Sequence, residues 1–144
     1  MNEFREAFRR AISASTERLP VSPELRFEAE RDVLIIPSQN DQGFEIQLEC
    51  MDYGVYPSSD GWHGGCWDVT VWEPNKLEVE ITEFIHSVAN DAVLEVYYSN
   101  LKAYKWVLHH TIEDERISDG TGQIFFNWFG RKSKKVFSNG NVAP

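Results

Sequence analysis

The chain of 144 residues has no long apolar run, only two cysteines and fewer basic than acidic side chains. No apolar stretch approaches the roughly 20 residues that a membrane-spanning helix needs, so we expect no membrane segment. Two cysteines are too few for a disulfide-rich scaffold, and the first ten residues carry charges throughout without the apolar core of a secretion signal. We therefore expect a cytoplasmic protein with reduced thiols.

The motifs of common nucleotide-binding and hydrolytic sites are also missing. Gly120 and Gly122 lack the strand, helix and spacing of a phosphate-binding loop, and neither a serine elbow nor a zinc-protease helix occurs in the sequence. The interval from His63 to Cys66 suits zinc, but no second pair of ligands accompanies it. We expect no metal site and no cofactor.

Charge is distributed unevenly along the chain. Residues 24–95 include 16 acidic and 3 basic side chains, a net charge of −13, whereas residues 96–144 include 4 acidic and 7 basic side chains, a net charge of +3. The acidic segment would repel phosphate, so nucleic acid is not an expected partner. A basic protein is the expected partner, and the sequence predicts no particular oligomeric state.

The spacing of apolar residues predicts the helix and strands of the first part of the chain. A 3.6-residue pattern predicts a helix over residues 2–18, with Arg5, Arg9 and Arg10 directed toward water. Residues 25–36 predict one strand or two short ones bent near Arg31. Strict alternation over residues 43–52 predicts a strand that turns Cys50 toward the core.

The second half is expected to be β-rich. Residues 53–65 read as a loop and residues 66–73 as a strand. A helix follows from Pro74, with capping-box spacing between Asn75 and Glu78. The remaining expected elements are a hairpin of residues 92–98 and 102–111, a polar loop over 113–122, and a second hairpin of 123–129 and 134–137.

This order predicts a single α+β domain over residues 1–144: a curved antiparallel sheet of about six to seven strands with two helices packed on one face. The residues expected in its core are Phe4, Phe8, Ile12, Ile81, Phe84, Ile85, Leu94, Val96, Trp106 and Leu108.

The stretch from Asp60 to Trp72 concentrates unusual residues. It holds three of the five tryptophans and one of the two cysteines, and its first half contains three glycines. Glycine favours turns, so we expect Trp62 and Asp60 to be exposed on a loop. The stretch is either a binding or catalytic loop or a tight turn into a hydrophobic core.

One catalytic alternative centres on Cys66. The run Gly65, Cys66 and Trp67 resembles the neighbourhood of the nucleophile in papain-like cysteine hydrolases, which implies a base at His109 or His110. In those families the cysteine opens a helix, whereas residues 68–72 here predict a strand. A structural cysteine is therefore favoured, and a housekeeping domain with a small-molecule pocket is a further alternative.

In size, acidity and α+β layout the chain is similar to many small bacterial immunity proteins. These proteins neutralise toxins by covering a basic active site, so the resemblance implies a non-enzymatic, acidic binding domain with a basic protein partner. Buried aromatic anchors and steering charges are the expected features of such a surface. The candidate binding residues are Glu45, Glu49, Asp60 and Trp62.

Overall fold

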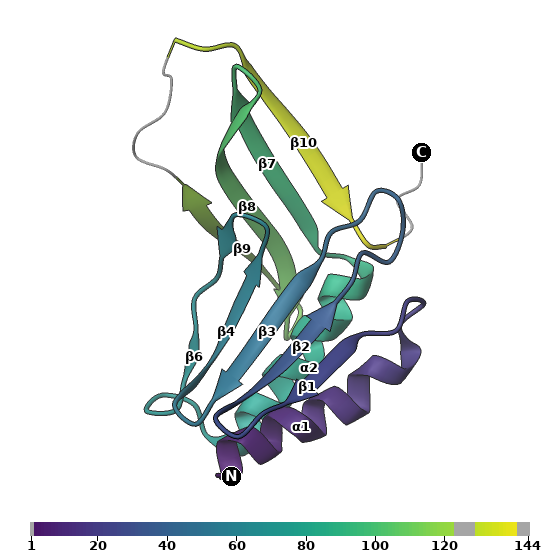
Figure 1. The fold of residues 1–144 in the computed structure, drawn as a ribbon, viewed down its shortest axis with the longest axis vertical. Helices are drawn as coiled ribbons and strands as arrows, with labels where there is room; N and C mark the ends of the chain where they lie inside the picture. The colour runs from purple at the N-terminus through teal and green to yellow at the C-terminus, as the bar shows by residue number, and fades with distance from the viewer. Residues whose placement is uncertain (1, 123–128, 141–144) are drawn as a thin grey trace.

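Ten strands form two antiparallel sheets (Figure 1), in a computed structural model that describes residues 2–122 and 129–140. The strands of the first sheet are β1 (Glu24–Phe27), β2 (Arg31–Ile36), β3 (Ile46–Met51), β4 (Gly54–Ser59), β5 (Trp62–His63) and β6 (Trp67–Asp68), with β5 and β6 both paired to β4. The strands of the second sheet, in spatial order, are β10 (Lys132–Ser138), β7 (Val93–Ser99), β8 (Lys102–Ile112) and β9 (Glu115–Gly122). The α+β class is confirmed, although two sheets replace the single sheet that we expected.

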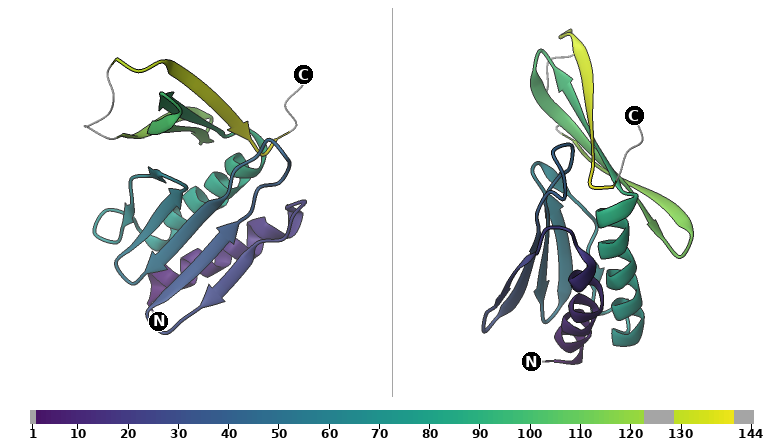
Figure 2. Two further views of the ribbon diagram at one scale, coloured as in Figure 1. Left: turned by 45° about the horizontal axis from the view of Figure 1, so that its top comes forward. Right: turned by 90° about the vertical axis from the view of Figure 1, so that its right-hand side faces the viewer.

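Two helices cover one face of the first sheet (Figure 2). Helix α1 (Glu3–Ser15) begins after Asn2, whose side chain accepts a hydrogen bond from the Arg5 amide at 3.0 Å, and it continues into a 3₁₀ turn at Thr16–Arg18. Helix α2 (Pro74–Asn90) begins with proline, whose fixed φ suits the first helical position. Nine of the ten expected core residues are buried, and Trp106 is partly buried.

An ion cluster joins α1 to the first sheet. Asp32 on β2 is fully buried and receives hydrogen bonds from Arg5 at 2.8 Å and from Arg9 at 2.8 and 2.9 Å. Arg5 also donates to the carbonyls of Glu28 and Ala29. The expectation that Arg5 faces water is wrong, because a carboxylate from another element compensates its burial.

The side chain of Asn139, which follows β10, joins segments from the two halves of the chain. Its Oδ1 accepts hydrogen bonds from the amides of Gln39 and Phe44, both at 3.0 Å. Its Nδ2 donates to the carbonyls of Phe44 at 2.9 Å and Val88 at 3.2 Å. A single buried amide thus satisfies backbone groups near the start of β3 and near the end of α2.

Strand β9 corrects the predicted loop over residues 113–122. It pairs with β8 through a turn at Glu113 and Asp114, which both have positive φ, at 52° and 62°. Positive φ at both central residues is the geometry of a tight hairpin turn that usually requires Asn or Gly. Of the predicted second hairpin, residues 123–128 lie outside the described residues, and β10 pairs with β7.

Strand β4 likewise corrects the predicted loop over residues 53–65. Pro57 lies within it, and its carbonyl points away from β3 to accept the amide hydrogen of Gly64 at 3.1 Å. In an antiparallel strand the N–H and C=O of one residue point to the same side, so the missing N–H leaves the pairing with β3 intact.

The strand predicted over residues 66–73 is also largely wrong. Only Trp67 and Asp68 are in a strand, because the amides of Val71 and Trp72 both donate to the Asp68 carbonyl and start a turn. Val71 is consequently 75% exposed. The capping box at Asn75 is wrong too, since Asn75 lies inside α2 and Glu73 occupies the N-cap position without a side-chain bond.

Candidate functional site

The Asp60–Trp72 stretch connects the first sheet to the second. The Trp62 indole Nε1 donates a hydrogen bond to the Asp119 carbonyl on β9 at 2.9 Å, and Trp62 is only 1% exposed. The neighbouring His63 amide donates to the Thr121 hydroxyl at 3.0 Å. The expectation of an exposed Trp62 is therefore wrong, because β9 covers the loop that carries it.

A cavity of about 360 Å³ lies beside this connection. It is bounded by β4, the segment around β6, α2, β8 and β9. Its lining is rich in aromatic rings and includes two carboxylates, one imidazole and one thiol. The lining residues used below are Trp62, Cys66, Trp67, Trp72, Glu80, Phe84, His110 and Asp119.

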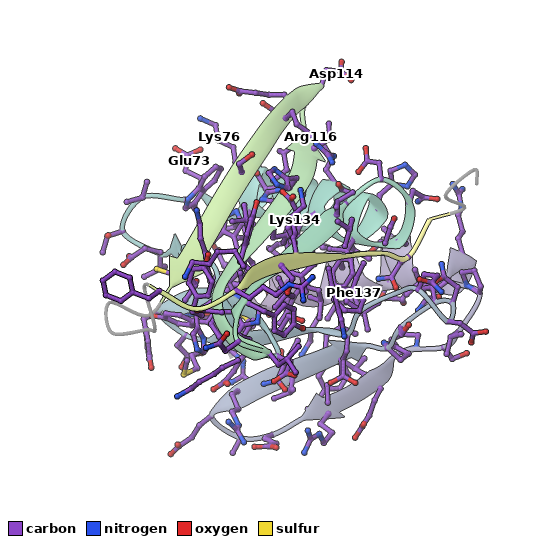
Figure 3. The ribbon with its side chains drawn as sticks, turned by 90° about the horizontal axis from the view of Figure 1, so that it is seen from above. Glu73, Lys76, Asp114, Arg116, Lys134 and Phe137 are labelled. Atoms are coloured by element: carbon purple, nitrogen blue, oxygen red, sulfur yellow. The ribbon has the colours of Figure 1, made fainter. Side chains whose placement is uncertain are left out.

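A second hollow of about 490 Å³ adjoins this cavity. The two hollows share Trp72 and Glu80, and the second also reaches Lys76 on α2 and Glu113 in the β8–β9 turn. We call the two hollows together the Trp72 groove. Figure 3 shows Asp114 at the far end of the β8–β9 hairpin, next to the turn residue Glu113.

The groove holds the carboxylates of Glu80 and Glu113, and Glu83 on α2 lies beside it, where it accepts a hydrogen bond from the Glu113 amide at 2.9 Å. Burial raises the pKa of Glu80, and the nearby carboxylates of Glu113 and Glu83 raise it further. No ion pair forms at any of these three side chains within residues 2–122 and 129–140. Like charges held together in this way favour the arrival of a cation.

His110 and Asp119 face the cavity from neighbouring strands. His110 is 6% exposed, and its Nδ1 has no hydrogen-bond partner among the described residues. Burial lowers the pKa of His110, so its imidazole is neutral at pH 7. Asp119 Oδ2 accepts the amide hydrogen of Gly65 at 2.9 Å, which fixes the loop beside Cys66.

No family model, curated protein or solved structure matches the chain. The arguments about function therefore depend on this geometry. None of the described helices is long and apolar enough to cross a membrane. Nor do three or more His, Cys, Asp or Glu side chains of the described residues converge into a possible metal site.

The structure separates the two histidines that were candidate bases for Cys66. Cys66 is exposed and His110 is buried, and both line the cavity. His109 points to the opposite face of the second sheet, where its ring contacts Glu95 and Ser118. Only His110 is therefore placed near Cys66.

The predicted binding residues fall in three places. Glu45 and Asp60 line a separate groove of about 310 Å³ between the two sheets, together with Trp106. Glu49 lies on the half-buried face of β3, opposite the buried side chains of Leu48 and Cys50, and forms an ion pair with Arg31 at 3.2 Å. Trp62 is buried in the lining of the cavity, so these four residues do not form one surface.

Sequence reasoning missed three main residues of the groove. The sequence pattern predicted Trp72 in a strand and Asp119 in a loop, and Glu80 fell within the helix predicted from Pro74 without being singled out. The spacing of Glu80 and Glu83 on one helix was the available signal, because residues three apart lie on the same face. Their closeness to Glu113 depends on the unexpected strand β9.

The two thiols should differ sharply in reactivity. Cys50 is fully buried, and burial raises the pKa of its thiol to about 12, whereas Cys66 is exposed. Because the thiolate is the reactive form, we expect one equivalent of a thiol reagent to react with the native protein and a second only after unfolding. The Cys66→Ser variant should leave the native protein unreactive. Native labelling of Cys50 would contradict the position of β3.

Proposed function

We propose that this chain is a non-enzymatic binding domain that covers a basic surface of a protein partner, as small bacterial immunity proteins do. The observation that carries the proposal is the cluster of Glu80, Glu83 and Glu113 beside the aromatic Trp72 groove, where no cationic side chain of residues 2–122 and 129–140 forms an ion pair with any of the three. A partner cation would relieve the repulsion within this trio. An aromatic floor supplies the kind of anchor that interfaces use.

The charge pattern of the whole chain supports a basic partner. The segment with a net charge of −13 forms the first sheet and α2, and it also contributes Glu95 to the second sheet. Complementary charge accelerates association and excludes wrong partners. Binding, and not catalysis, is favoured because the groove places several carboxylates beside large aromatic rings and contains a single thiol.

The charge-reversed variant Glu83→Lys/Glu113→Lys tests the proposal. A partner is first isolated from source cells, and its association rate is then measured at low and high salt. We expect the double variant to lower the association rate about tenfold at low salt, with a smaller effect at high salt because salt screens exposed charges.

The matched control is Glu45→Lys/Asp60→Lys, which reverses the two carboxylates of the separate groove between the sheets. Both double variants change the net charge by the same amount, so a difference between their association rates must come from the position of the charges. A larger loss in the control would assign the interface to Glu45 and Asp60. If neither variant changes the association rate of the partner, the proposal is overturned.

A cysteine hydrolase is the second candidate, because Cys66 and His110 line one cavity. In that function the neutral imidazole would accept the thiol proton, and the thiolate would attack the acyl carbon of an ester or thioester. The bond to the leaving alcohol or thiol would break as the imidazolium returns the proton to it, and water would then hydrolyse the acyl–Cys66 bond. Hydrolysis of a thioester or ester probe that Cys66→Ser abolishes would support it. Activity that Cys66→Ser leaves unchanged would rule it out.

A further inference from the structure

The cavity beside Cys66 offers a more specific chemistry than an acidic surface. From its aromatic rings, carboxylates and buried imidazole, we propose that it binds a guanidinium cation, such as the side chain of an arginine. The inference rests on the proposed function, because it names the group that the partner would insert. Free arginine derivatives carry the same group, so the site can also be tested without the partner.

The aromatic lining suits a flat cation. Trp67, Trp72 and Phe84 all line the cavity, and Phe84 packs edge-on against both Trp67 and His110. A cation over an aromatic face is stabilised by the ring's quadrupole, most strongly by tryptophan. Guanidinium is planar and weakly hydrated, so it stacks on rings more readily than an ammonium group does.

Two carboxylates supply acceptors for its N–H groups. Glu80 lines the cavity from α2 and Asp119 from β9, so two different elements each contribute a carboxylate. The Glu80 carboxylate also accepts a hydrogen bond from the Trp67 side chain. Asp119 uses Oδ2 to hold the Gly65 amide, and within the described residues no hydrogen bond is formed to its Oδ1. Guanidinium forms paired, charge-assisted hydrogen bonds with carboxylates, which a single ammonium point charge does not reproduce.

A second observation that points to a ligand is the buried side chain of His110. A buried polar atom without a partner costs free energy unless a donor reaches it. Its ring lines the cavity, and its Nδ1 has no partner in the described part of the chain. In the tautomer that leaves Nδ1 unprotonated, an N–H donor of the ligand would satisfy this atom, whereas a quaternary ammonium group carries no donor. Hydrogen-bond donors therefore distinguish the expected ligand from other organic cations.

No cationic side chain of the described residues lines the cavity itself. The nearest cation in the groove is Lys76, which is exposed and lines only the adjoining hollow. The cavity volume of about 360 Å³ lies within the range of small-ligand sites. Cys66, exposed at the lining, marks an accessible wall of the cavity.

The test uses N-acetylarginine amide as probe and N-acetylcitrulline amide as its neutral isostere. Binding to the full chain is followed by tryptophan fluorescence and by the rate at which Cys66 reacts with a thiol reagent. We expect saturable binding of the arginine probe with protection of Cys66, and at least about tenfold weaker binding of the citrulline probe. The lysine amide should also bind at least about threefold more weakly than the arginine probe.

Two variants locate the site. Glu80→Gln should weaken arginine binding about tenfold, because it removes one carboxylate while keeping the side chain's size. Glu45→Gln, in the separate groove, should leave binding unchanged. Unchanged Cys66 labelling in Glu80→Gln without probe would show that the cavity wall is intact.

The outcomes separate this inference from the proposed function. Equal binding of the arginine and citrulline probes, or of the arginine and lysine probes, would overturn a guanidinium site. Absence of saturable binding up to the solubility of the probe would overturn it as well. If Glu80→Gln weakens binding of the arginine probe but leaves the affinity for the partner unchanged, the guanidinium site is supported. The same result would overturn the role of this site in partner binding.

Discussion

Replacing Asp32 by Ala is expected to lower the free energy of unfolding by about 3–5 kcal/mol, a large part of the stability of an ordinary domain. The variant leaves the Arg5 guanidinium, whose side chain is 4% exposed, without its buried counter-charge, and Arg9 loses two hydrogen bonds. Urea unfolding followed by tryptophan fluorescence measures the loss.

Asp52→Asn is the matched control. Asp52 also contacts Arg5, at 3.7 Å, but its side chain is 62% exposed. Exposed ion pairs contribute little, so we expect a change below about 1 kcal/mol. A similarly small effect for Asp32→Ala would mean that water or another carboxylate replaces it, contrary to the geometry of the cluster.

The same cluster predicts sensitivity to acid. Burial alone would raise the pKa of Asp32, but hydrogen bonds from Arg9 and Arg5 outweigh it, and the pKa lies below its ordinary value of 3.8. A lowered pKa means that the stabilisation is complete at neutral pH. It is lost progressively as the pH falls below about 4 toward the folded-state pKa. Asp32→Asn should flatten this part of the pH profile.

Replacing Trp62 by Ala is expected to lower the free energy of unfolding by about 3–5 kcal/mol, because a fully buried large ring leaves a cavity. It also removes the hydrogen bond from the indole to the Asp119 carbonyl, which links the two sheets. Chemical denaturation monitored by circular dichroism measures the change. Had Trp62 been an exposed anchor, the main effect would have been on partner dissociation.

Trp62→Phe separates the two contributions. Phenylalanine keeps much of the buried apolar area and loses the indole N–H, so we expect a smaller loss, of about 1–3 kcal/mol. Equal losses in Trp62→Ala and Trp62→Phe would assign the whole effect to the hydrogen bond. A loss below about 1 kcal/mol in Trp62→Ala would contradict its burial.

Periodicity predicted the elements whose buried faces are continuous. Strand β3 alternates Ile46, Leu48 and Cys50 against polar neighbours, and the buried residues of α1 and α2 follow helical spacing. Such a pattern reflects a boundary between core and water. Strand β9 was not predicted, because it lacks an apolar alternation: Ser118 and Gly120 lie on its exposed face. It also follows a turn that contains neither glycine nor asparagine, so the usual hairpin signal is absent.

The candidate site was harder to predict for a different reason. Cys66 and His110 were each identified, but Trp72, Glu80 and Asp119 come from separate elements that meet only when β9 joins β8. The burial of Arg5 depends in the same way on a carboxylate 27 positions away. A local pattern carries no information about such pairings, because they are made by the tertiary structure.

Asn139 has a consequence for the order of folding during synthesis. Its side chain satisfies the backbone of Phe44, a residue 95 positions earlier, and of Gln39, 100 positions earlier. A ribosome will have released most of the first sheet long before Asn139 emerges. Until then, the segment leading into β3 lacks these partners and is exposed to competing contacts, as is usual for chains that depend on distant pairings. Asn139, close to the end of the described residues, therefore satisfies backbone groups of a segment that was synthesised much earlier.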